Sequence, residues 1–233
     1  MLLSGAPAWA KPAASADPRA AKALAALRAN FSPLRDLSAE VTVETTLKGL
    51  LTEQVYRQRY RYAFMRPSLV RLDFLEPPGD VLIARGQTVW RNGRVSQGAA
   101  KPEDAASPLS LWALTVGSPE IESRFRVASF AEPARQHLTG LMFTPRGDNA
   151  ADVTVKVWVD TGRGVVEETK IFGTDNQWLS TSAVGEFKRF GRTWLPVVMT
   201  TLGCEGRCKT VIRYADVRLN PGLSATLFAT SKK

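Results

Sequence analysis

The sequence predicts a mainly β (α+β) protein, built as a strongly curved, incompletely closed antiparallel β-barrel with an N-terminal helix. Three observations indicate this fold class. Long stretches alternate apolar and polar residues with a period of two, as strands with one buried face do. Turn signals separate these stretches at regular spacing. The 233 residues, 44% of them hydrophobic, are enough for one large all-β domain, and we expect a single domain over residues 17–233.

The first sixteen residues resemble the remnant of a signal peptide. A short apolar stretch is followed by two triplets typical of cleavage sites, Ala8-Trp9-Ala10 and Ala14-Ser15-Ala16, but no basic segment precedes it. A disordered alanine-rich tail is the alternative interpretation. Ala6 stands where a lipoprotein would carry its lipidated cysteine. We therefore expect an exported, soluble protein without a lipid anchor.

A helix is predicted directly after this leader. Asp17 is a suitable N-cap, and Pro18 occupies the first helical position, where proline is favoured. Leu24, Leu27 and Phe31 form an apolar stripe at helical spacing. The helix should end near residues 30–33.

Strand patterns account for most of the remaining chain. The clearest is the alternation of valine and polar residues over 153–159, and Asn92-Gly93 is a strong signal for a two-residue hairpin turn. About ten strands with regular turns indicate an antiparallel sheet that curls toward a barrel. The predicted strands are residues 37–47, 51–65, 69–75, 81–84, 88–91, 153–159, 165–172, 178–190, 193–202 and 210–219.

Two short helices are predicted to interrupt the sheet, at residues 109–116 and from the N-cap pattern at 118–120. Leu109, Trp112 and Val116 form one stripe of the first helix, and further leucines lie off that stripe. The helix is therefore apolar around most of its circumference and should be buried on more than one side. It could be a lid over an apolar cavity or a plug that fills the barrel.

The strand pair within residues 56–74 has one apolar and one basic face. On the first strand Arg57, Arg59 and Arg61 alternate with aromatic residues, so the aromatic face should be the inner one. Arg66 shares the parity of the aromatic residues, and a guanidinium on the apolar side is costly without partners. The predicted inner residues of this pair are Tyr60, Tyr62, Phe64, Val70, Leu72 and Phe74.

The only two cysteines, Cys204 and Cys208, flank a short segment between two strand patterns. In an exported protein this arrangement predicts a disulfide across a hairpin tip. A redox centre would need a CxxC spacing or an activating helix N-terminus. A zinc site would need more ligands than the single histidine, His137, can add. We therefore expect no metal and no other cofactor.

The formal net charge of +9 arises largely from arginines that are spread along the strands. A solvated outer sheet face, anionic lipid headgroups or an acidic partner surface would each fit this distribution. Nucleic acid is an improbable partner for an exported protein, although it would also use such charge. His137 has no motif that pairs it with a nucleophile, so the sequence does not indicate an enzyme.

Several short motifs stand in the same order as in a known protein family. They are Arg66-Pro67, Glu76-Pro77-Pro78, Val81-Leu82-Ile83 and Gly86-Gln87-Thr88-Val89-Trp90. The similarity extends more weakly from Leu37 to Phe228, where residues 141–146 are similar to a mid-chain strand of the family and Leu227-Phe228 to its closing strand. On these motifs the chain resembles the periplasmic lipoprotein carriers of Gram-negative bacteria, the LolA-like family.

The resemblance implies a monomeric periplasmic carrier that shields the acyl chains of lipoproteins, or of related lipids, between the inner and outer membranes. It would receive cargo from an inner-membrane transporter and pass it to an outer-membrane acceptor. The resemblance also favours short lid helices over an apolar cavity. The six inner residues named above would line that cavity, Leu111 and Trp112 would lie above it, and Arg66 would hold the lid closed by donating to carbonyls at the C-terminal end of the lid helix.

A carrier of this kind has a simple physical basis. An acyl chain of about 15 methylenes costs roughly 12 kcal/mol to hold in water, at ~0.8 kcal/mol per methylene, so its passage through an aqueous compartment needs a protein cavity. The alternative from another class is a periplasmic lipid or lipoprotein sensor that regulates a partner protein. An additional C-terminal domain would favour that alternative.

Overall fold

The computed structural model describes residues 17–49, 51–85, 88–96, 121–122, 125–146, 153–173 and 175–230. The helical elements are α1 (Pro18–Phe31) and the 3-10 turns η1 (Pro133–Arg135), η2 (Cys204–Gly206) and η3 (Ala225–Phe228). The strands are β1 (Asp36–Lys48), β2 (Glu53–Met65), β3 (Leu69–Glu76), β4 (Pro78–Arg85), β5 (Thr88–Arg91), β6 (Arg94–Ser96), β7 (Phe125–Phe130), β8 (Thr139–Pro145), β9 (Thr154–Asp160), β10 (Val165–Phe172), β11 (Trp178–Phe190), β12 (Thr193–Gly203) and β13 (Cys208–Leu219).

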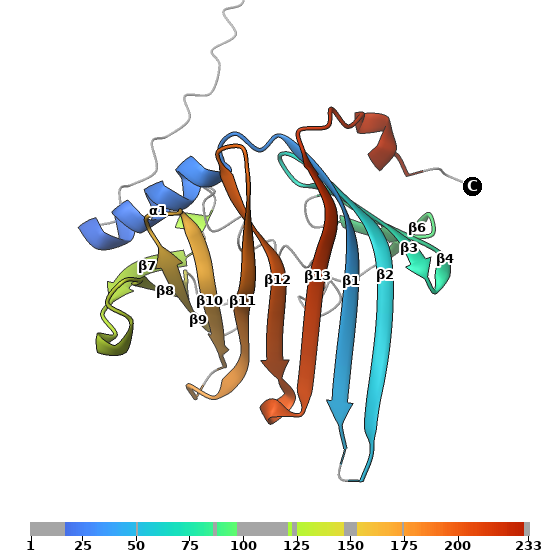
Figure 1. The fold of residues 1–233 in the computed structure, drawn as a ribbon. Coiled ribbons are helices and arrows are strands. Elements are labelled where there is room, and N and C mark those ends of the chain that lie inside the picture. Colours follow the sequence, from blue (N-terminus) through green and yellow to red (C-terminus); the bar gives the residue numbers. More distant parts are fainter. Residues whose placement is uncertain are drawn as a thin grey trace, which may run out of the picture.

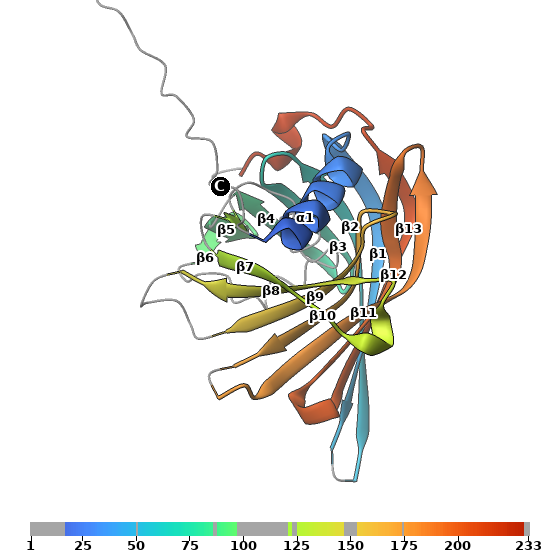
Figure 2. The same ribbon diagram turned by 90° about the vertical axis from the view of Figure 1, so that its left-hand side faces the viewer.

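These strands form one antiparallel sheet of thirteen strands in the order β6-β5-β4-β3-β2-β1-β13-β12-β11-β10-β9-β8-β7. The sheet is strongly curved, and α1 lies on its concave side, which we call the inner face (Figure 1; Figure 2). Within the described residues β6 and β7 end the strand order without pairing with each other, so the barrel is not closed. The predicted fold class, a curved and open antiparallel barrel with an N-terminal helix, is confirmed.

Most of the predicted elements are present with small shifts of their ends, and β8 lies where the resemblance placed a strand at residues 141–146. Two further strands, β6 and β7, complete the sheet. The predicted helix at 109–116 and the leader at 1–16 lie outside the described residues. Of the helix expected to follow the N-cap pattern at 118–120, residues 121–122 are described, and both are helical. The hairpin turn at Asn92-Gly93 joins β5 to β6 as predicted.

The prediction of a closing strand at Leu227-Phe228 is wrong, because these residues belong to the 3-10 turn η3. The Ser224 hydroxyl accepts a backbone N–H at the start of this turn and so favours it over an extended chain. Arg71 Nη1 donates to the Leu227 carbonyl at 2.7 Å, and Arg85 Nη2 donates to the Phe228 carbonyl at 2.7 Å. Two arginine side chains from β3 and β4 therefore satisfy carbonyls that a neighbouring strand would otherwise have to satisfy.

Helix α1 begins at the predicted N-cap. Asp17 Oδ1 accepts the backbone N–H groups of Arg19 at 2.9 Å and Ala20 at 3.2 Å. Asp17 Oδ2 also accepts the backbone N–H of Ser129, in β7, at 2.6 Å. One carboxylate thus caps the helix and ties it to the last strand of the sheet.

The other end of α1 is tied to β12. The Asn30 side chain, which is 7% exposed, donates from Nδ2 to the Trp194 carbonyl at 2.9 Å. The Trp194 N–H donates back to Asn30 Oδ1 at 2.8 Å. The Asn30 amide therefore satisfies both the N–H and the carbonyl of Trp194, as a neighbouring strand would.

The turn between β9 and β10 approaches α1 closely at Gly164. Its φ is +66°, and a Cβ atom built on it would lie 2.3 Å from the Ala26 carbonyl oxygen. Only glycine allows both this backbone conformation and this distance. The turn therefore packs directly on the helix backbone.

The outer face of the β1–β2 hairpin carries the charge that the sequence predicts. Arg57 pairs with Glu44 at 2.9 Å, and Arg59 pairs with Glu40 at 2.6 Å. At the tip of the neighbouring hairpin, Cys204 and Cys208 form the predicted disulfide between β12 and β13. The basic strand face is therefore the solvated one, and the cysteines close a hairpin.

The close approach at Gly164 predicts a specific loss of stability. Gly164→Ala should lower the free energy of unfolding by more than Gly191→Ala does. Both glycines have positive φ, so both substitutions carry a backbone cost of roughly 1–2 kcal/mol, but a Cβ at Gly191 would meet nothing within 4 Å. Urea denaturation of the two variants gives the comparison. Equal losses would contradict a tight contact between the turn and α1.

The Asp17 carboxylate predicts an acid-dependent contribution to stability. Hydrogen bonds, above all from the Ser129 N–H, lower its pKa from 3.8 to about 2. A lowered pKa in the folded state means that the ionised group stabilises the fold above about pH 4 and that this contribution declines as the pH falls toward 2. Urea denaturation should find the wild type more stable than Asp17→Asn at pH 5. A difference that stays constant down to pH 2 would contradict this assignment.

Candidate functional site

The six residues predicted to line a cavity lie together on the inner face of β2 and β3. Five of them are buried, and Phe74 is partly buried beside them. The ring centroids of Tyr60 and Phe74 are 5.4 Å apart. The other two predicted lining residues, Leu111 and Trp112, lie outside the described residues. The directly opposite pairs are Tyr60 with Phe74, Tyr62 with Leu72 and Phe64 with Val70.

The apolar surface continues from these strands across β1, β13 and β12. We call a set of directly opposite residues that share the inner face a rung. Tyr60 pairs with Val41, and Val41 pairs with Tyr214. The next rung holds Val43, Ile212 and Met199, with Gln58 at its β2 end. Gln58 is exposed, but the other members named here are buried, so the inner face is a broad apolar surface.

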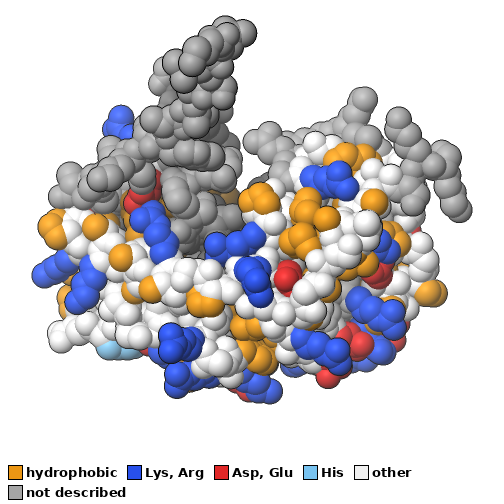
Figure 3. Space-filling model, turned by 90° about the horizontal axis from the view of Figure 1, so that it is seen from above, with side chains coloured by type: hydrophobic (Ala, Val, Ile, Leu, Met, Phe, Trp, Pro, Cys, Tyr) orange, Lys and Arg blue, Asp and Glu red, His pale blue; other side chains and the backbone are white. Residues whose placement is uncertain are grey.

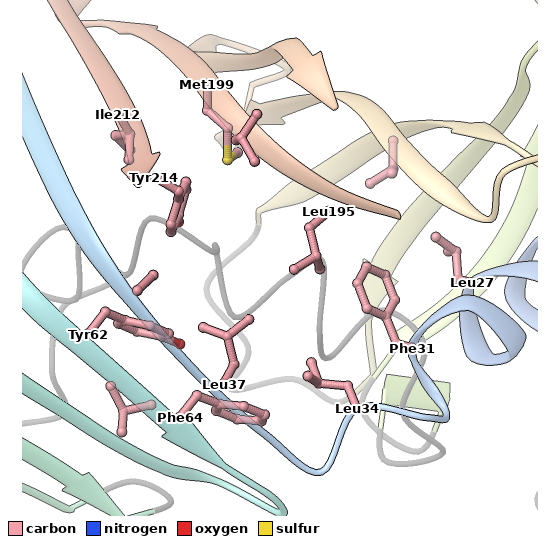
Figure 4. Close-up of a cluster of buried hydrophobic side chains, with 14 of the residues drawn as sticks. Leu27, Phe31, Leu34, Leu37, Tyr62, Phe64, Leu195, Met199, Ile212 and Tyr214 are labelled. Carbon is pink, nitrogen blue, oxygen red and sulfur yellow. The ribbon is translucent and has the colours of Figure 1, made fainter. Parts of the chain in front are cut away.

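The members of these rungs on β1, β12 and β13 are not among the predicted lining residues. Each of these strands alternates in its own sequence, so its apolar face could have been found. The pairing of β1 with β13, however, joins the two ends of the chain, and no local pattern reveals it. Figure 4 shows Tyr62, Met199, Ile212 and Tyr214 extending from three strands toward the same space.

Near α1 the inner face is covered by the helix. Leu27 and Phe31 from α1 meet Leu34, Leu37 and Leu195 (Figure 4), and all five side chains are at most 2% exposed. This end of the sheet is therefore an ordinary packed core. The candidate site is the part of the inner face that lies farther from α1.

The inner face carries no charge in this region. Among the described residues, the rung of Tyr60, Val41 and Tyr214 and the rung of Val43, Ile212 and Met199 have no charged member. Lysine and arginine side chains instead lie scattered over the exterior, as Figure 3 shows for one face. Burial raises the pKa of Tyr60 and of Tyr214, so both phenols stay neutral. The Tyr214 hydroxyl is buried and has no hydrogen-bond partner among the described residues.

Burial along β2 changes toward the β1–β2 hairpin. Tyr56 has the same parity as the inner-facing Tyr60, but its side chain is 52% exposed. The hairpin projects beyond the neighbouring strands, so its end lacks the packing that buries Tyr60 (Figure 1). Alternation correctly assigned the face, but it could not show where the strand leaves the core.

Arg66 has a different setting from the one that its parity suggested. Strand β2 ends at Met65, so the alternation does not reach Arg66, which is exposed in the following turn. Its Nη2 donates to the Phe31 carbonyl at the end of α1 at 2.6 Å. The helix at 109–116, its expected acceptor, lies outside the described residues. Arg66 therefore donates to the C-terminal end of a helix, as predicted for the lid helix, but the helix in the described structure is α1.

The described part of the chain brings no three His, Cys, Asp or Glu side chains together in a way that could hold a metal ion. His137 lies exposed in the turn between η1 and β8. None of the helices in the described ranges combines the length and the apolar character needed to cross a membrane. What the inner face offers is an uncharged apolar surface with a few neutral hydroxyl groups.

The fold has close counterparts among solved structures. A DUF1329 family protein from Desulfovibrio piger aligns with a TM-score of 0.71 and 14% identity over 91% of this chain and 98% of its own. A putative outer membrane lipoprotein-sorting protein domain from Vibrio parahaemolyticus aligns with a TM-score of 0.62 and 17% identity over 90% and 97%. A LolA superfamily protein from Nitrosomonas europaea aligns with a TM-score of 0.61 and 13% identity over 90% and 97%.

The sequence itself gives a second, independent comparison. A search against curated proteins gave no match. Residues 53–182, more than half of the chain, match the family model described as outer membrane lipoprotein carrier protein LolA. This segment contains β2 and β3, which carry the six predicted lining residues. The chain therefore belongs to the LolA family.

Proposed function

We propose that the chain is a periplasmic carrier that shields the acyl chains of lipoproteins, or of related lipids, between the inner and outer membranes. The observation that carries this proposal is the uncharged apolar inner face on β3, β2, β1, β13 and β12. Membership of the LolA family supports it, since that family is described as one of lipoprotein carriers. An inner-membrane donor and an outer-membrane acceptor belong to the same proposal.

The energetic demand on such a carrier is large. Each methylene that leaves water gains roughly 0.8 kcal/mol, so even one acyl chain needs a surface several rungs long. Successive inner-facing residues on a strand are about 6.6 Å apart, and an extended chain advances about 1.3 Å per methylene. Beyond the packed core beside α1, the rungs of Tyr214 and Ile212 thus provide apolar contact along the strands. Met199 adds a flexible side chain that adapts to different chain shapes.

We also propose that Arg66 holds the turn after β2 and the end of α1 together beside this surface. Its hydrogen bond to the Phe31 carbonyl ties the turn after β2 to the end of α1. Strand β2 carries three of the predicted lining residues. Because Arg66 is largely exposed to solvent, this part-buried bond contributes about 1 kcal/mol. The sequence-based proposal that Arg66 clasps a lid formed by residues 109–116 also stands. The Arg66→Leu variant tests both roles.

Carrier function predicts that the purified protein keeps a fluorescent triacylated lipopeptide in the supernatant during ultracentrifugation. Met199→Glu should reduce this retention severalfold, because a carboxylate on the uncharged inner face opposes acyl chains. Leu202→Glu is the matched control, since Leu202 lies on the same strand but on the outer face and is 39% exposed. Thermal melting checks that both variants fold.

Two outcomes would contradict this prediction in different ways. A wild-type protein that leaves the lipopeptide in the pellet would remove the carrier proposal. Equal retention by folded Met199→Glu and Leu202→Glu would mean that the cargo does not occupy the inner face. Because Glu at Met199 could unfold the sheet, Met199→Trp serves as a second variant that fills the surface without adding charge.

The Arg66 tie predicts a local change in hydrogen exchange. Arg66→Leu should speed amide exchange over residues 28–34 by about fivefold, as expected from the loss of ~1 kcal/mol, and leave the centre of β2 unchanged. Arg66→Lys keeps the charge but lacks the planar fork, so it should restore only part of the protection. Faster exchange at 109–116 alone would assign Arg66 to a lid instead. No change in either segment would reduce it to a surface residue.

A further inference from the structure

One rung of the inner face carries a hydroxyl side chain on each of six neighbouring strands, from β2 to β10, and continues with the apolar Val157 on β9 and Leu141 on β8. We call the six hydroxyl-bearing residues the hydroxyl rung. Two adjacent pairs within it are hydrogen-bonded, Thr45 to Thr210 at 3.1 Å and Ser182 to Thr201 at 2.8 Å. In strand order the hydroxyl rung is Tyr56, Thr45, Thr210, Thr201, Ser182 and Thr169.

The hydroxyl rung lies on the side of the apolar rungs that is away from α1. Along β13 the residues Tyr214, Ile212 and Thr210 face the same side, so Thr210 is about 13 Å along the strand from Tyr214. Tyr214 and Ile212 are buried, whereas Thr45 and Thr210 are half-buried. The inner face therefore changes from apolar to hydroxyl-bearing where it changes from buried to accessible.

This change introduces hydrogen-bonding groups without introducing charge. Between the hydroxyl rung and that of Tyr214 lie Gln58, Val43, Ile212, Met199 and Val184. On the far side of the hydroxyl rung, β2, β1, β13 and β12 place Gln54, Leu47, Cys208 and Gly203. None of these described residues is charged, although the whole chain carries a net charge of +9.

The hydroxyls can take a further partner. Each threonine or serine hydroxyl has one donor and two acceptor lone pairs, so a pair that shares one hydrogen bond still has a free donor. Tyr214 adds another neutral donor deeper on the same strand face. Its buried hydroxyl has no hydrogen-bond partner among the described residues, and such a group gains from any acceptor that a ligand brings to it.

We propose that the hydroxyl rung is a specificity subsite for the uncharged carbonyl group, ester or amide, that joins the acyl chains of a ligand to its polar part. The inference rests on the proposed carrier function. The acyl chains would lie along the apolar rungs, and the hydroxyls would donate to the carbonyl oxygen. A free fatty acid would instead place a carboxylate on a surface that has no cation to pair with it.

Two lipids that differ only in this carbonyl test the proposal. Monolauroylglycerol has an ester-linked chain, and 1-O-dodecylglycerol has an ether-linked chain of the same length and the same glycerol headgroup. Binding of each is measured at pH 8 by displacement of a fluorescent alkyl probe. The wild type should bind the ester about fivefold more tightly than the ether, which corresponds to about 1 kcal/mol.

A double variant identifies the residues responsible. Thr45→Val with Thr210→Val removes both members of one hydrogen-bonded pair, so neither hydroxyl is left without its partner, and valine suits a strand. The ester and ether should then bind with nearly equal affinity. Thr46→Val with Thr200→Val is the control, since these threonines lie on the outer face beside Thr45 and Thr201, and it should keep the wild-type preference. Circular dichroism and melting verify the fold of both variants.

The possible outcomes separate this subsite from carrier function. If neither lipid binds the wild type, the carrier proposal itself fails. If both bind equally well, or if laurate binds more tightly than the ester, apolar binding stands and the subsite is overturned. If the preference for the ester persists in the folded Thr45 and Thr210 variant, these hydroxyls do not read the carbonyl, and the proposal is wrong.

Discussion

Helix α1 joins parts of the sheet that no strand pairing brings together. Its first turn is tied to β7, at one end of the strand order, by the Asp17 carboxylate on the Ser129 N–H. Its last turn is tied to β12 through Asn30 and to the β2–β3 turn through Arg66. Among the described strands no closing pair fixes the curvature of the sheet, so these hydrogen bonds fix it instead. The shape of the inner face therefore depends on how α1 is held.

The position of α1 also explains why the inner face has two different ends. Leu27 and Phe31 fill the space beside the helix, so the rungs next to it form a packed core. Farther along the strands the helix no longer covers the sheet, and the rung of Thr45 and Thr210 is half-buried. One end of a continuous surface thus forms the packed core, and the other end is the candidate site.

The sequence revealed what depends on neighbouring residues and missed what depends on distant ones. Alternation located Tyr60 and Leu72 on the inner face, and Asp17 with Pro18 identified the start of α1, because both signals are local. The alignment of Tyr60 with Tyr214 arises from pairing between the two ends of the chain, which alternation alone does not encode. The same limit explains the incorrect closing strand, since Arg71 and Arg85 satisfy the carbonyls of η3 from far away in the sequence.

The separation of charge between the two faces limits how a ligand can be recognised. On the outer face of β1 and β2, Arg59 and Arg57 form ion pairs with Glu40 and Glu44, whereas burial of unpaired charge would be costly on the inner face. Apolar contact is non-directional and scales with area, so it gives affinity without distinguishing one acyl compound from another. Discrimination then depends on the few directional groups that an uncharged surface can carry. On the described inner face beyond α1 those groups are mainly neutral hydroxyls, and their position along the strands sets where the polar part of a ligand would lie.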